Sequence, residues 1–247
     1  LLIGGYVGRQ MKLTRLKNDL IATVSHELKT PLASVRILVD TLLDNQCGNP
    51  QQTREYLAMI SSENARLCRL VENFLTFSRM ERGKRTLIFS EIDPGELVTA
   101  AVDAVKDRWN TEECRFDVET AGALPAIQAD RDAMVTVLLN LLENAYKYSD
   151  SPKHIQLRTT ASDGHVCFEV RDNGIGISRR AMKRIFDRFY QVDQSLSRKA
   201  GGCGLGLSIV KYIVDAHGGE VTVTSQPGKG SVFTVKIPVV TKSEPGT

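Results

Sequence analysis

The spacing of apolar residues constrains the fold of this chain more than any other feature, because it changes once, near Gly83. Between Met11 and Asn45 apolar side chains recur at steps of three and four residues, which predicts a long helix with one buried stripe. The stripe consists of Leu13, Leu16, Leu20, Val24, Leu28, Leu32, Val35, Val39 and Leu42. After Gly83 the apolar residues alternate over short segments instead. The two patterns predict a helical part followed by a part that contains strands.

The helical part is predicted to be a hairpin. Residues 47–50, Cys-Gly-Asn-Pro, interrupt the first helix, and a second helical pattern runs to Gly83, where a glycine after basic residues signals a helix end. Two helices alone bury only part of their apolar stripes, so we expect hairpins from two chains to pair as a four-helix bundle. The prediction is an all-α domain over residues 11–83 that forms a homodimer.

The part after Gly83 is predicted to be an α/β sandwich (α+β) with a mixed, mainly antiparallel sheet. Strand patterns cover residues 85–89, 114–119, 154–160, 165–170, 220–224 and 231–237, and helical patterns cover 94–109, 130–148 and 205–217. Turn signals at residues 163–164 and 227–230 favour antiparallel pairing. We expect this domain to span residues 84–240, with terminal tails at 1–10 and 241–247.

Composition excludes several classes of protein. The 247 residues are enough for two domains, and 42% hydrophobic with 25% charged residues is typical of soluble globular proteins. A net charge of +3 supplies no general electrostatic reason to bind nucleic acid, so none is expected as a partner. Five cysteines without a CxxC pair indicate reduced thiols in a cytoplasmic setting.

The first eight residues are apolar and are followed by Arg9 and Lys12. That is the pattern at the cytoplasmic end of a membrane helix, although eight residues cannot span a bilayer, which takes roughly 20. A frayed tail explains the segment equally well. On the membrane interpretation, the catalytic core is cytoplasmic and the full-length protein is anchored in the inner membrane through a missing N-terminal segment.

His26 lies on the predicted first helix but not on its apolar stripe. At about 100° per residue it points roughly 160–200° away from Val24 and Leu28, toward solvent. Glu27 is adjacent and is placed to take a proton from the imidazole, and Thr30 lies four residues on, on the same face. A neutral imidazole is a competent nucleophile near pH 7. His26 is therefore a candidate phosphoryl acceptor, with an ordinary surface histidine as the alternative.

Three later segments supply what a nucleotide needs. Asp172 follows a strand and can accept a hydrogen bond from an exocyclic amine, while Gly174 and Gly176 allow close backbone approach. The glycine-rich residues 201–206 run into a helix, whose free N–H groups suit phosphate oxygens. Taken singly, the first segment is also compatible with an ordinary turn and the second with a flexible loop.

The third segment is the helix that contains Asn140, Asn144 and Lys147, which share one face at spacings of four and three residues. Asparagine is a poor choice inside a helix, so two at helical spacing indicate a polar cavity. An asparagine oxygen suits Mg²⁺, which would arrive with the nucleotide and keep several waters.

The segment Ser-His-Glu-Leu-Lys-Thr-Pro-Leu at residues 25–32 resembles the phospho-acceptor segment of sensor histidine kinases of two-component systems. The three nucleotide segments, in this order, resemble the ATP-binding domain that these kinases share with type II topoisomerases and related ATPases. The resemblance implies Mg-ATP-dependent autophosphorylation of His26, with Glu27 as base, followed by transfer to an aspartate in the receiver domain of a response regulator. It also implies that Thr30 positions a water when the protein dephosphorylates that partner.

The same resemblance assigns the nucleotide contacts. Asn144 is the implied Mg²⁺ ligand and Asp172 the adenine ligand, and further binding residues are Asn140, Lys147, Tyr148, Gly174, Gly176, Gly202, Gly204, Leu205 and Gly206. Residues 185–190, Ile-Phe-Asp-Arg-Phe-Tyr, resemble the aromatic segment beside a mobile lid, here at 191–201.

Two positions distinguish members of that wider family. Hydrolytic members carry a glutamate four residues before the metal asparagine, whereas this chain has Asn140, which favours transfer to His26 over hydrolysis. Gln191 stands where many histidine kinases have arginine, which puts one phosphate contact in doubt. An ATP hydrolase and an ATP-sensing dimer that mainly promotes dephosphorylation are the competing hypotheses.

Overall fold

The computed structural model describes residues 25, 28–44, 49–81, 87–109, 113–192 and 204–240. Three of the predicted site residues, His26, Glu27 and Gly202, lie outside these ranges. Internal contacts divide the chain into two compact units. One contains the helices up to residue 79, and the other contains residues 80–193 together with the chain from residue 206 onward.

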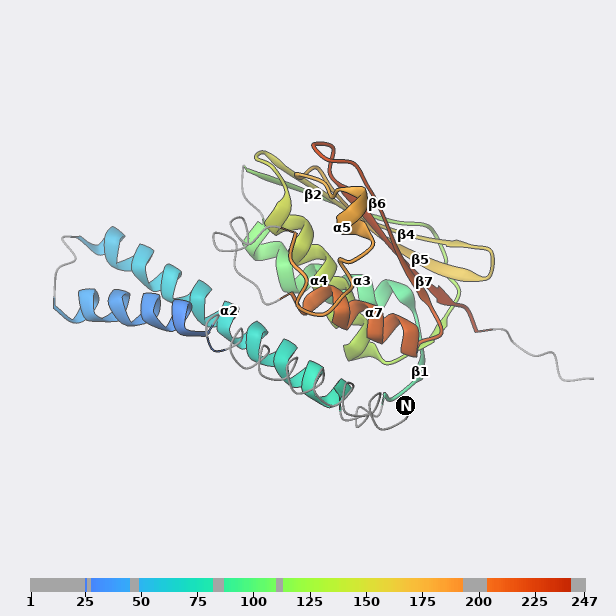
Figure 1. The fold of residues 1–247 in the computed structure, drawn as a ribbon, viewed down its shortest axis with the longest axis horizontal. Helices are drawn as coiled ribbons and strands as arrows, with labels where there is room; N and C mark the ends of the chain where they lie inside the picture. Colours follow the sequence, from blue (N-terminus) through green and yellow to red (C-terminus); the bar gives the residue numbers. More distant parts are fainter. Residues whose placement is uncertain are drawn as a thin grey trace, which may run out of the picture. The chain divides into compact units, whose positions relative to one another are not determined.

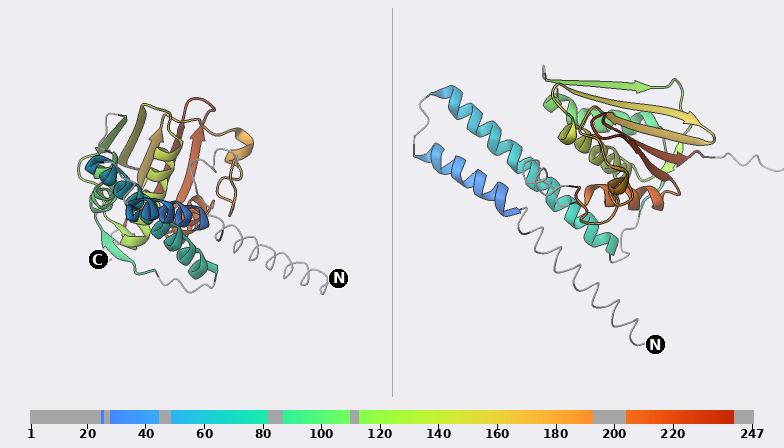
Figure 2. Two further views of the ribbon diagram at one scale, coloured as in Figure 1. Left: turned by 90° about the vertical axis from the view of Figure 1, so that its left-hand side faces the viewer. Right: turned by 45° about the horizontal axis from the view of Figure 1, so that its top comes forward.

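The first unit contains a helix at residues 28–43 that runs antiparallel to α2 (Pro50–Glu81), as Figures 1 and 2 show. The Asn49 side chain accepts a hydrogen bond from the backbone N–H of Gln52 at 2.8 Å, and Pro50 occupies the first helical position. Asparagine caps and a proline at this position both favour helix initiation. The predicted break at residues 47–50 therefore ends in a helix N-cap.

The hairpin buries only part of its apolar surface. Leu32 is 55% exposed and Leu43 is 74% exposed, although the sequence placed Leu32 in the buried stripe. Large exposed apolar side chains on the two helices are Leu32, Ile37, Val39, Leu43, Leu57, Met59, Val71 and Leu75. Such a surface favours burial against another helical face. Among the described helices, none combines the length and apolarity needed to cross a bilayer.

The second unit is the predicted two-layer α/β sandwich. Its five-stranded sheet has the order β2-β4-β5-β7-β6, in which β2 and β4 are parallel and the other neighbours are antiparallel. The strands are β2 (Cys114–Thr120), β4 (Lys153–Ser162), β5 (His165–Asp172), β6 (Glu220–Ser225) and β7 (Ser231–Pro238). Three helices cover one face (Figure 1): α3 (Pro94–Trp109), α4 (Arg131–Tyr148) and α7 (Gly206–Ala216). The predicted fold class is confirmed.

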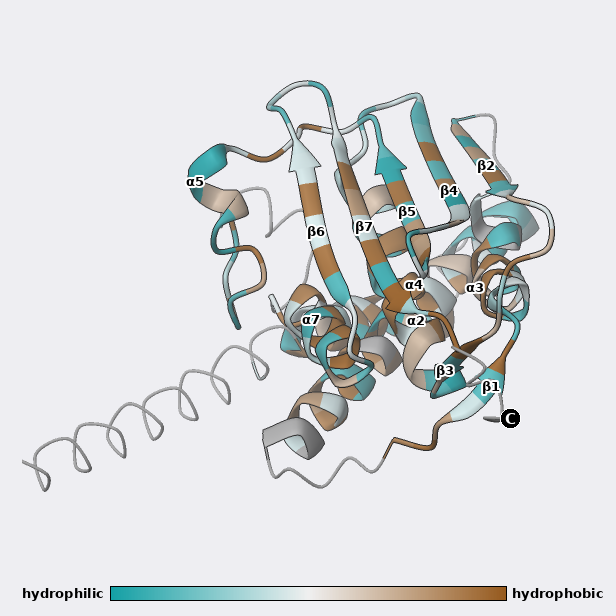
Figure 3. Cartoon of the chain, turned by 90° about the vertical axis from the view of Figure 1, so that its right-hand side faces the viewer, coloured by the Kyte–Doolittle hydropathy of each residue, from teal (hydrophilic) through white to brown (hydrophobic). Residues whose placement is uncertain are grey.

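Alternating hydropathy explains why these strands form a one-sided sheet, and Figure 3 shows the bands along each strand. In β4, Ile155, Leu157 and Thr159 are fully buried, whereas His154 and Arg158 are exposed. Residues two apart on a strand share a face, so the buried set packs beneath the helices and the polar set faces away from them. The α4 helix packs centrally, against both α3 and α7.

The sequence prediction was wrong at the short elements. Residues 87–89 of the predicted strand at 85–89 are not a strand, and the first strand is β1 (Ser90–Ile92), which pairs antiparallel with β3 (Ile127–Ala129). Neither β3 nor the one-turn helix α5 (Arg179–Met182) was predicted. Three or four residues are too few to display a period, so tertiary pairing decides such elements.

The buried Thr159 offers a test of the packing. Its hydroxyl is buried without a hydrogen-bond partner in the described part of the chain, which is an energetic cost. Thr159→Val replaces that hydroxyl with a methyl group of similar size and should raise the free energy of unfolding by about 1 kcal/mol. Urea denaturation measures the change, with Thr160→Val on the same strand as the control. A destabilised Thr159→Val variant would contradict the expectation.

Candidate functional site

Asp172 lies at the end of β5 and is only 7% exposed. Its Oδ1 accepts hydrogen bonds from the backbone N–H groups of Gly174 at 2.9 Å and Ser231 at 3.1 Å. No residue in the described part of the chain donates to Oδ2. Burial raises the pKa of Asp172 above its ordinary value, although the two backbone hydrogen bonds oppose the shift. One carboxylate oxygen is thus held in place, and the other can accept from a ligand.

Gly174 brings the loop after β5 against the end of α4. A Cβ atom at Gly174 would overlap the carbonyl oxygen of Tyr148, and the backbone N–H of Ile175 donates to that same oxygen at 3.2 Å. Ser149 and Gly174 also form an antiparallel bridge. The sequence analysis assigned two separate segments to the same nucleotide, residues 140–148 and residues 172–176. In the structure these segments are in backbone contact. Gly176 follows in the left-handed region, at a φ of 67°.

The α4 helix presents the predicted polar face. Its buried face consists of Ala133, Met134, Val137, Leu138, Leu141, Leu142 and Ala145. Asn140, Asn144 and Lys147 lie half-buried on the other side, as the spacing predicted. The Asn140 Nδ2 donates to the Thr136 carbonyl at 2.9 Å, and the Lys147 ammonium lies 4.7 Å from the centre of the Tyr148 ring. This hydrogen bond uses the Asn140 Nδ2 and does not involve its Oδ1.

That oxygen faces the start of α7. A Cβ atom at Gly206, the first residue of α7, would lie 2.7 Å from the Asn140 Oδ1. Glycine at this position therefore lets the first residue of α7 approach the Asn140 side chain closely. Before it, Gly204 has a φ of 68° and Leu205 is fully buried. The helix begins one residue later than predicted, and its first N–H groups have no intrahelical partner.

Both ends of α4 are held by residues that the sequence did not single out as site residues. At the N-terminus the Asp130 side chain accepts from the Ala133 N–H at 2.9 Å, and the Asp130 N–H donates to His217 Nε2 at 3.0 Å. At the C-terminus the Lys153 ammonium donates to the carbonyls of Tyr146 and Ser149, at 2.9 and 3.1 Å. A cation at a helix C-terminus is favourable. An aspartate directly before a helical pattern is a recognised N-cap signal. No local sequence pattern, by contrast, marks Lys153 as a residue that would cap the C-terminus of α4.

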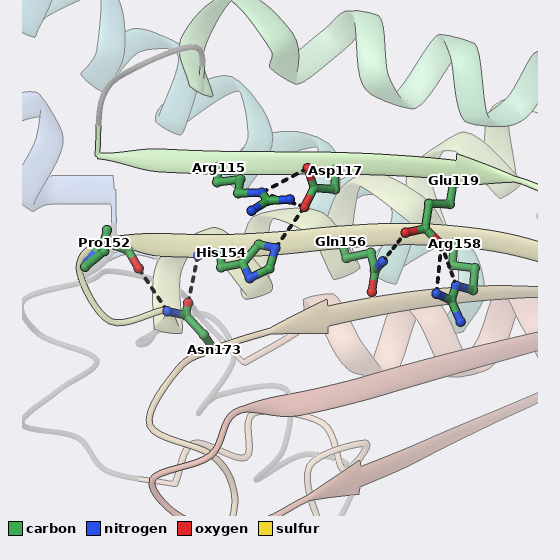
Figure 4. A network of polar contacts seen from close by, with 8 residues as sticks. All are labelled: Arg115, Asp117, Glu119, Pro152, His154, Gln156, Arg158 and Asn173. Atoms are coloured by element: carbon green, nitrogen blue, oxygen red, sulfur yellow. Dashed lines mark hydrogen bonds and ion pairs between the residues drawn. The ribbon is translucent and has the colours of Figure 1, made fainter.

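Asn173 ties the loop to the neighbouring strand. Its Oδ1 accepts from the His154 N–H at 2.9 Å, and its Nδ2 donates to the Pro152 carbonyl at 2.9 Å, as Figure 4 shows. The His154 ring contacts Asp117 at 2.8 Å, and that hydrogen bond, aided by Arg115, lowers the pKa of Asp117. Asn173 therefore holds the loop after β5 against the start of β4.

The remaining predicted positions are placed as follows. Thr30 is exposed on the helix at residues 28–43. In the aromatic segment Ile185 is buried, and the rings of Phe186, Phe189 and Tyr190 are half-buried. Gln191 is half-buried, and most of the predicted lid lies outside the described residues. The described part of the chain has no cluster of three His, Cys, Asp or Glu side chains arranged to hold a metal ion.

Comparisons with known families match both parts of the chain. Residues 16–83 match the His Kinase A (phospho-acceptor) domain. Residues 129–241 match the family described as histidine kinase-, DNA gyrase B- and HSP90-like ATPase. The two matched ranges follow the order of the helical part and the sandwich.

Individual proteins agree with these family matches. The sensor-like histidine kinase SenX3 of Mycolicibacterium smegmatis is 31% identical over 236 residues, which are 94% of this chain and 61% of that relative. The solved structure of full-length ShkA in complex with AMPPNP is 30% identical, covers 92% of this chain and 47% of its own, and has a TM-score of 0.64.

The histidine kinase ThkA, solved in complex with the response regulator protein TrrA, is 22% identical and shows likeness of fold. It has a TM-score of 0.64 and covers 96% of this chain and 65% of its own. This chain therefore spans only part of the length of the relatives it matches.

Proposed function

This chain belongs to the sensor histidine kinases of two-component systems, and we propose that it uses Mg-ATP to phosphorylate His26 and then transfers the phosphoryl group to an aspartate of a response regulator. The observation that carries the nucleotide part is the placement of Asp172. Its buried carboxylate has one oxygen held by two backbone N–H groups and lies beside the contact between Gly174 and the end of α4. The protein would act as a protein-histidine kinase.

Adenine recognition follows from the chemistry of that carboxylate. An exocyclic amine donates hydrogen bonds, and the Asp172 Oδ2 is an acceptor in a poorly solvated position. A hydrogen bond to a charged acceptor contributes about 1.5–3 kcal/mol, and more is lost when a buried partner is left unmatched. Gly174 and Gly176 let this loop pack against the backbone of Tyr148 and Gln226, whose carbonyl oxygens a Cβ atom would overlap. Guanine presents a carbonyl oxygen where adenine has its amine, so Asp172 selects adenine.

Phosphate and metal binding are assigned to α4 and α7. The first N–H groups of α7, together with Gly204, Leu205 and Gly202, would hold phosphate oxygens at the positive end of the helix. Lys147 supplies a cation on the same face of α4 as Asn144. The neutral Asn144 oxygen suits Mg²⁺, which supplies charge neutralisation on the phosphates when it is bound with ATP. Tyr148 lies at the junction with the Gly174 loop.

The proposed transfer has two steps. A ring nitrogen of His26 attacks the γ-phosphorus, a P–N bond forms, and the bond from that phosphorus to the β–γ bridging oxygen breaks. The ring proton passes to Glu27, and ADP leaves with the bridging oxygen. In the second step the P–N bond breaks as an aspartate oxygen of the partner forms a P–O bond. Positioning and charge neutralisation provide most of the catalysis.

Asn140 supports transfer over hydrolysis. Its Nδ2 is engaged with the Thr136 carbonyl and its oxygen faces Gly206. A carboxamide is not a base that can take a proton from water, so this position cannot activate a hydrolytic water as a glutamate would. The competing hypothesis of an ATP hydrolase therefore has no catalytic base at position 140.

The proposal includes two partners. The exposed apolar residues of the hairpin, among them Leu43 and Leu57, favour a homodimer through a four-helix bundle. ThkA is solved with a response regulator, which supports a receiver domain as the second partner. Thr30 is exposed, and its proposed role is to position a water for dephosphorylation of that partner. Membrane attachment depends on residues 1–8, outside the described part, and stays a prediction.

Labelling with γ-³²P ATP and Mg²⁺ tests the proposal. We expect an acid-labile, base-stable label on the wild-type chain, lost in His26→Gln because the nucleophile is gone and lost in Asn144→Asp because the metal ligand is altered. His165→Gln, the same change at the β4–β5 turn, is the matched control and should label normally. Label that persists in His26→Gln would exclude His26 as the acceptor. Steady phosphate release without protein-bound label would indicate a hydrolase instead.

A further inference from the structure

Ser225, the last residue of β6, has a hydroxyl whose hydrogen-bonding capacity is fully used. Its Oγ donates to the Gly230 carbonyl at 2.9 Å and accepts from the backbone N–H of Ile177 at 2.8 Å. The Ser231 hydroxyl oxygen lies 3.0 Å from the Ser225 Oγ. Because the Ser225 O–H already donates to the Gly230 carbonyl, the Ser231 hydroxyl is the donor in this contact. One side chain therefore joins two segments that are 48 residues apart in sequence.

These contacts hold both sides of Asp172. Ile177 follows the loop that begins after Asp172, while Ser231 is the residue whose N–H donates to Asp172 Oδ1 at 3.1 Å. A second link runs parallel to the first, since the Gly228 N–H donates to the Ile175 carbonyl at 2.8 Å. Loop and turn thus form one unit, which we define as the base-side clamp: residues 172–177 and residues 225–231.

We propose that Ser225 is a positioning residue for base selection, because it holds the base-side clamp closed and so fixes the direction of the free Asp172 oxygen. This inference rests on the proposed adenine-binding role of Asp172. To discriminate between adenine and guanine, the free Asp172 oxygen must accept a hydrogen bond from the adenine amine and must repel the guanine carbonyl oxygen. If the loop can shift by a fraction of an ångström, a water molecule or a rotation of the carboxylate can remove the repulsion between the Asp172 oxygen and the guanine carbonyl. Ser225 acts through the loop, because its hydroxyl is occupied by Ile177, Gly230 and Ser231.

Removing the hydroxyl should affect base selection more than phosphoryl transfer. Ser225→Ala leaves the Ile177 N–H without the Ser225 acceptor, and leaves the Gly230 carbonyl with only the longer bond from the Gln226 N–H at 3.4 Å, which loosens the clamp. We expect the Kd for an ATP analogue to rise about 10-fold and the preference for ATP over GTP to fall by about the same factor. The rate of His26 labelling at saturating ATP should stay within about 2-fold, because Asn144 and Lys147 lie on α4, outside the clamp.

The experiment compares binding of non-hydrolysable ATP and GTP analogues with Mg²⁺ by calorimetry, and labelling rates over a range of ATP concentrations. Thr224→Ala, the exposed neighbour on the same strand, is the matched control. Thermal unfolding checks that each variant is folded, and Ser225→Cys, which keeps the size and weakens the hydrogen bonds, should show the same direction of change.

The outcomes separate this inference from the proposed function. A Ser225→Ala variant that keeps the wild-type preference for ATP over GTP overturns the positioning role, whether its affinity is unchanged or is lowered equally for both nucleotides. A fall in maximal labelling rate without a change in nucleotide preference also overturns it. A wild-type chain that binds neither analogue overturns the proposed function, and this inference with it.

Discussion

Replacing Asp172 with asparagine should weaken Mg-ATP binding by about 100-fold and should not lower the stability of the fold. The binding loss follows because the carboxamide offers an NH₂ group where the carboxylate accepts, so an exocyclic amine meets either a donor or a weaker, uncharged acceptor. A loss of about 3 kcal/mol corresponds to that factor. Calorimetric titration with an ATP analogue measures it, and Asp163→Asn at the exposed β4–β5 turn is the control.

The stability expectation follows from the pKa of Asp172, which burial raises above the ordinary value of 3.8. A raised folded-state pKa means that the folded chain holds a proton where the unfolded chain has lost it. Stability from this group is therefore fully present below the unfolded pKa and is lost as pH rises through the folded pKa. Asp172→Asn removes that titration, so its stability relative to wild type should improve as pH rises through this window.

Urea denaturation at several pH values between 3 and 8 measures the difference between Asp172→Asn and wild type. A difference that does not vary with pH would contradict the raised pKa. Retained ATP affinity in the variant would contradict the adenine-binding role of Asp172. The two results are independent, because the first concerns the cost of burying the charge and the second concerns what the charge binds.

Replacing Gly174 with alanine should damage both stability and nucleotide binding. The added Cβ would overlap the Tyr148 carbonyl, and that atom belongs to backbone at the end of α4, which cannot rotate away as a side chain can. Forced backbone shifts of this kind cost about 3 kcal/mol. For a domain of this size the expected fall in Tm is roughly 6–12 °C. The loop must also move away from α4, so ATP binding should weaken with it.

Gly122→Ala is the matched control, because a Cβ atom at Gly122 would meet nothing within 4 Å. Its Tm should stay within about 1 °C of wild type, since an exposed substitution without new contacts has little effect. Differential scanning calorimetry measures both variants, and titration with an ATP analogue measures binding. A Gly174→Ala variant as stable as Gly122→Ala would show that the loop and α4 separate without cost, and would remove the reason for glycine at this position.

The long elements and the polar face of α4 were predictable because their signals are local. The α3 helix has the predicted bounds, and α4 begins after Asp130, which caps it as a helix-initiating aspartate should. Asn140, Asn144 and Lys147 share a face because a helix turns by about 100° per residue. Hydropathy that repeats every three to four residues needs no knowledge of distant segments.

The supports of the site were not predictable, since each joins residues far apart in the chain. Lys153 caps α4 only because β4 starts beside the end of that helix. Ser225 meets Ile177 across 48 residues, and the Ser231 N–H meets Asp172 across 59. No local pattern encodes which backbone groups will face one another across such separations. The parallel pairing of β2 with β4 is another such outcome.

The sequence by itself determined the two-part organisation, the sandwich class and the functional groups offered by the candidate nucleotide segments, because periodicity, capping residues and functional groups are properties of short stretches. Only the tertiary structure decided that Gly174 touches Tyr148, that Asn140 faces Gly206, and that one oxygen of Asp172 is held while the other is left for a ligand. Those arrangements depend on strand register and helix packing, in which a shift of one residue would turn each side chain away from its partner.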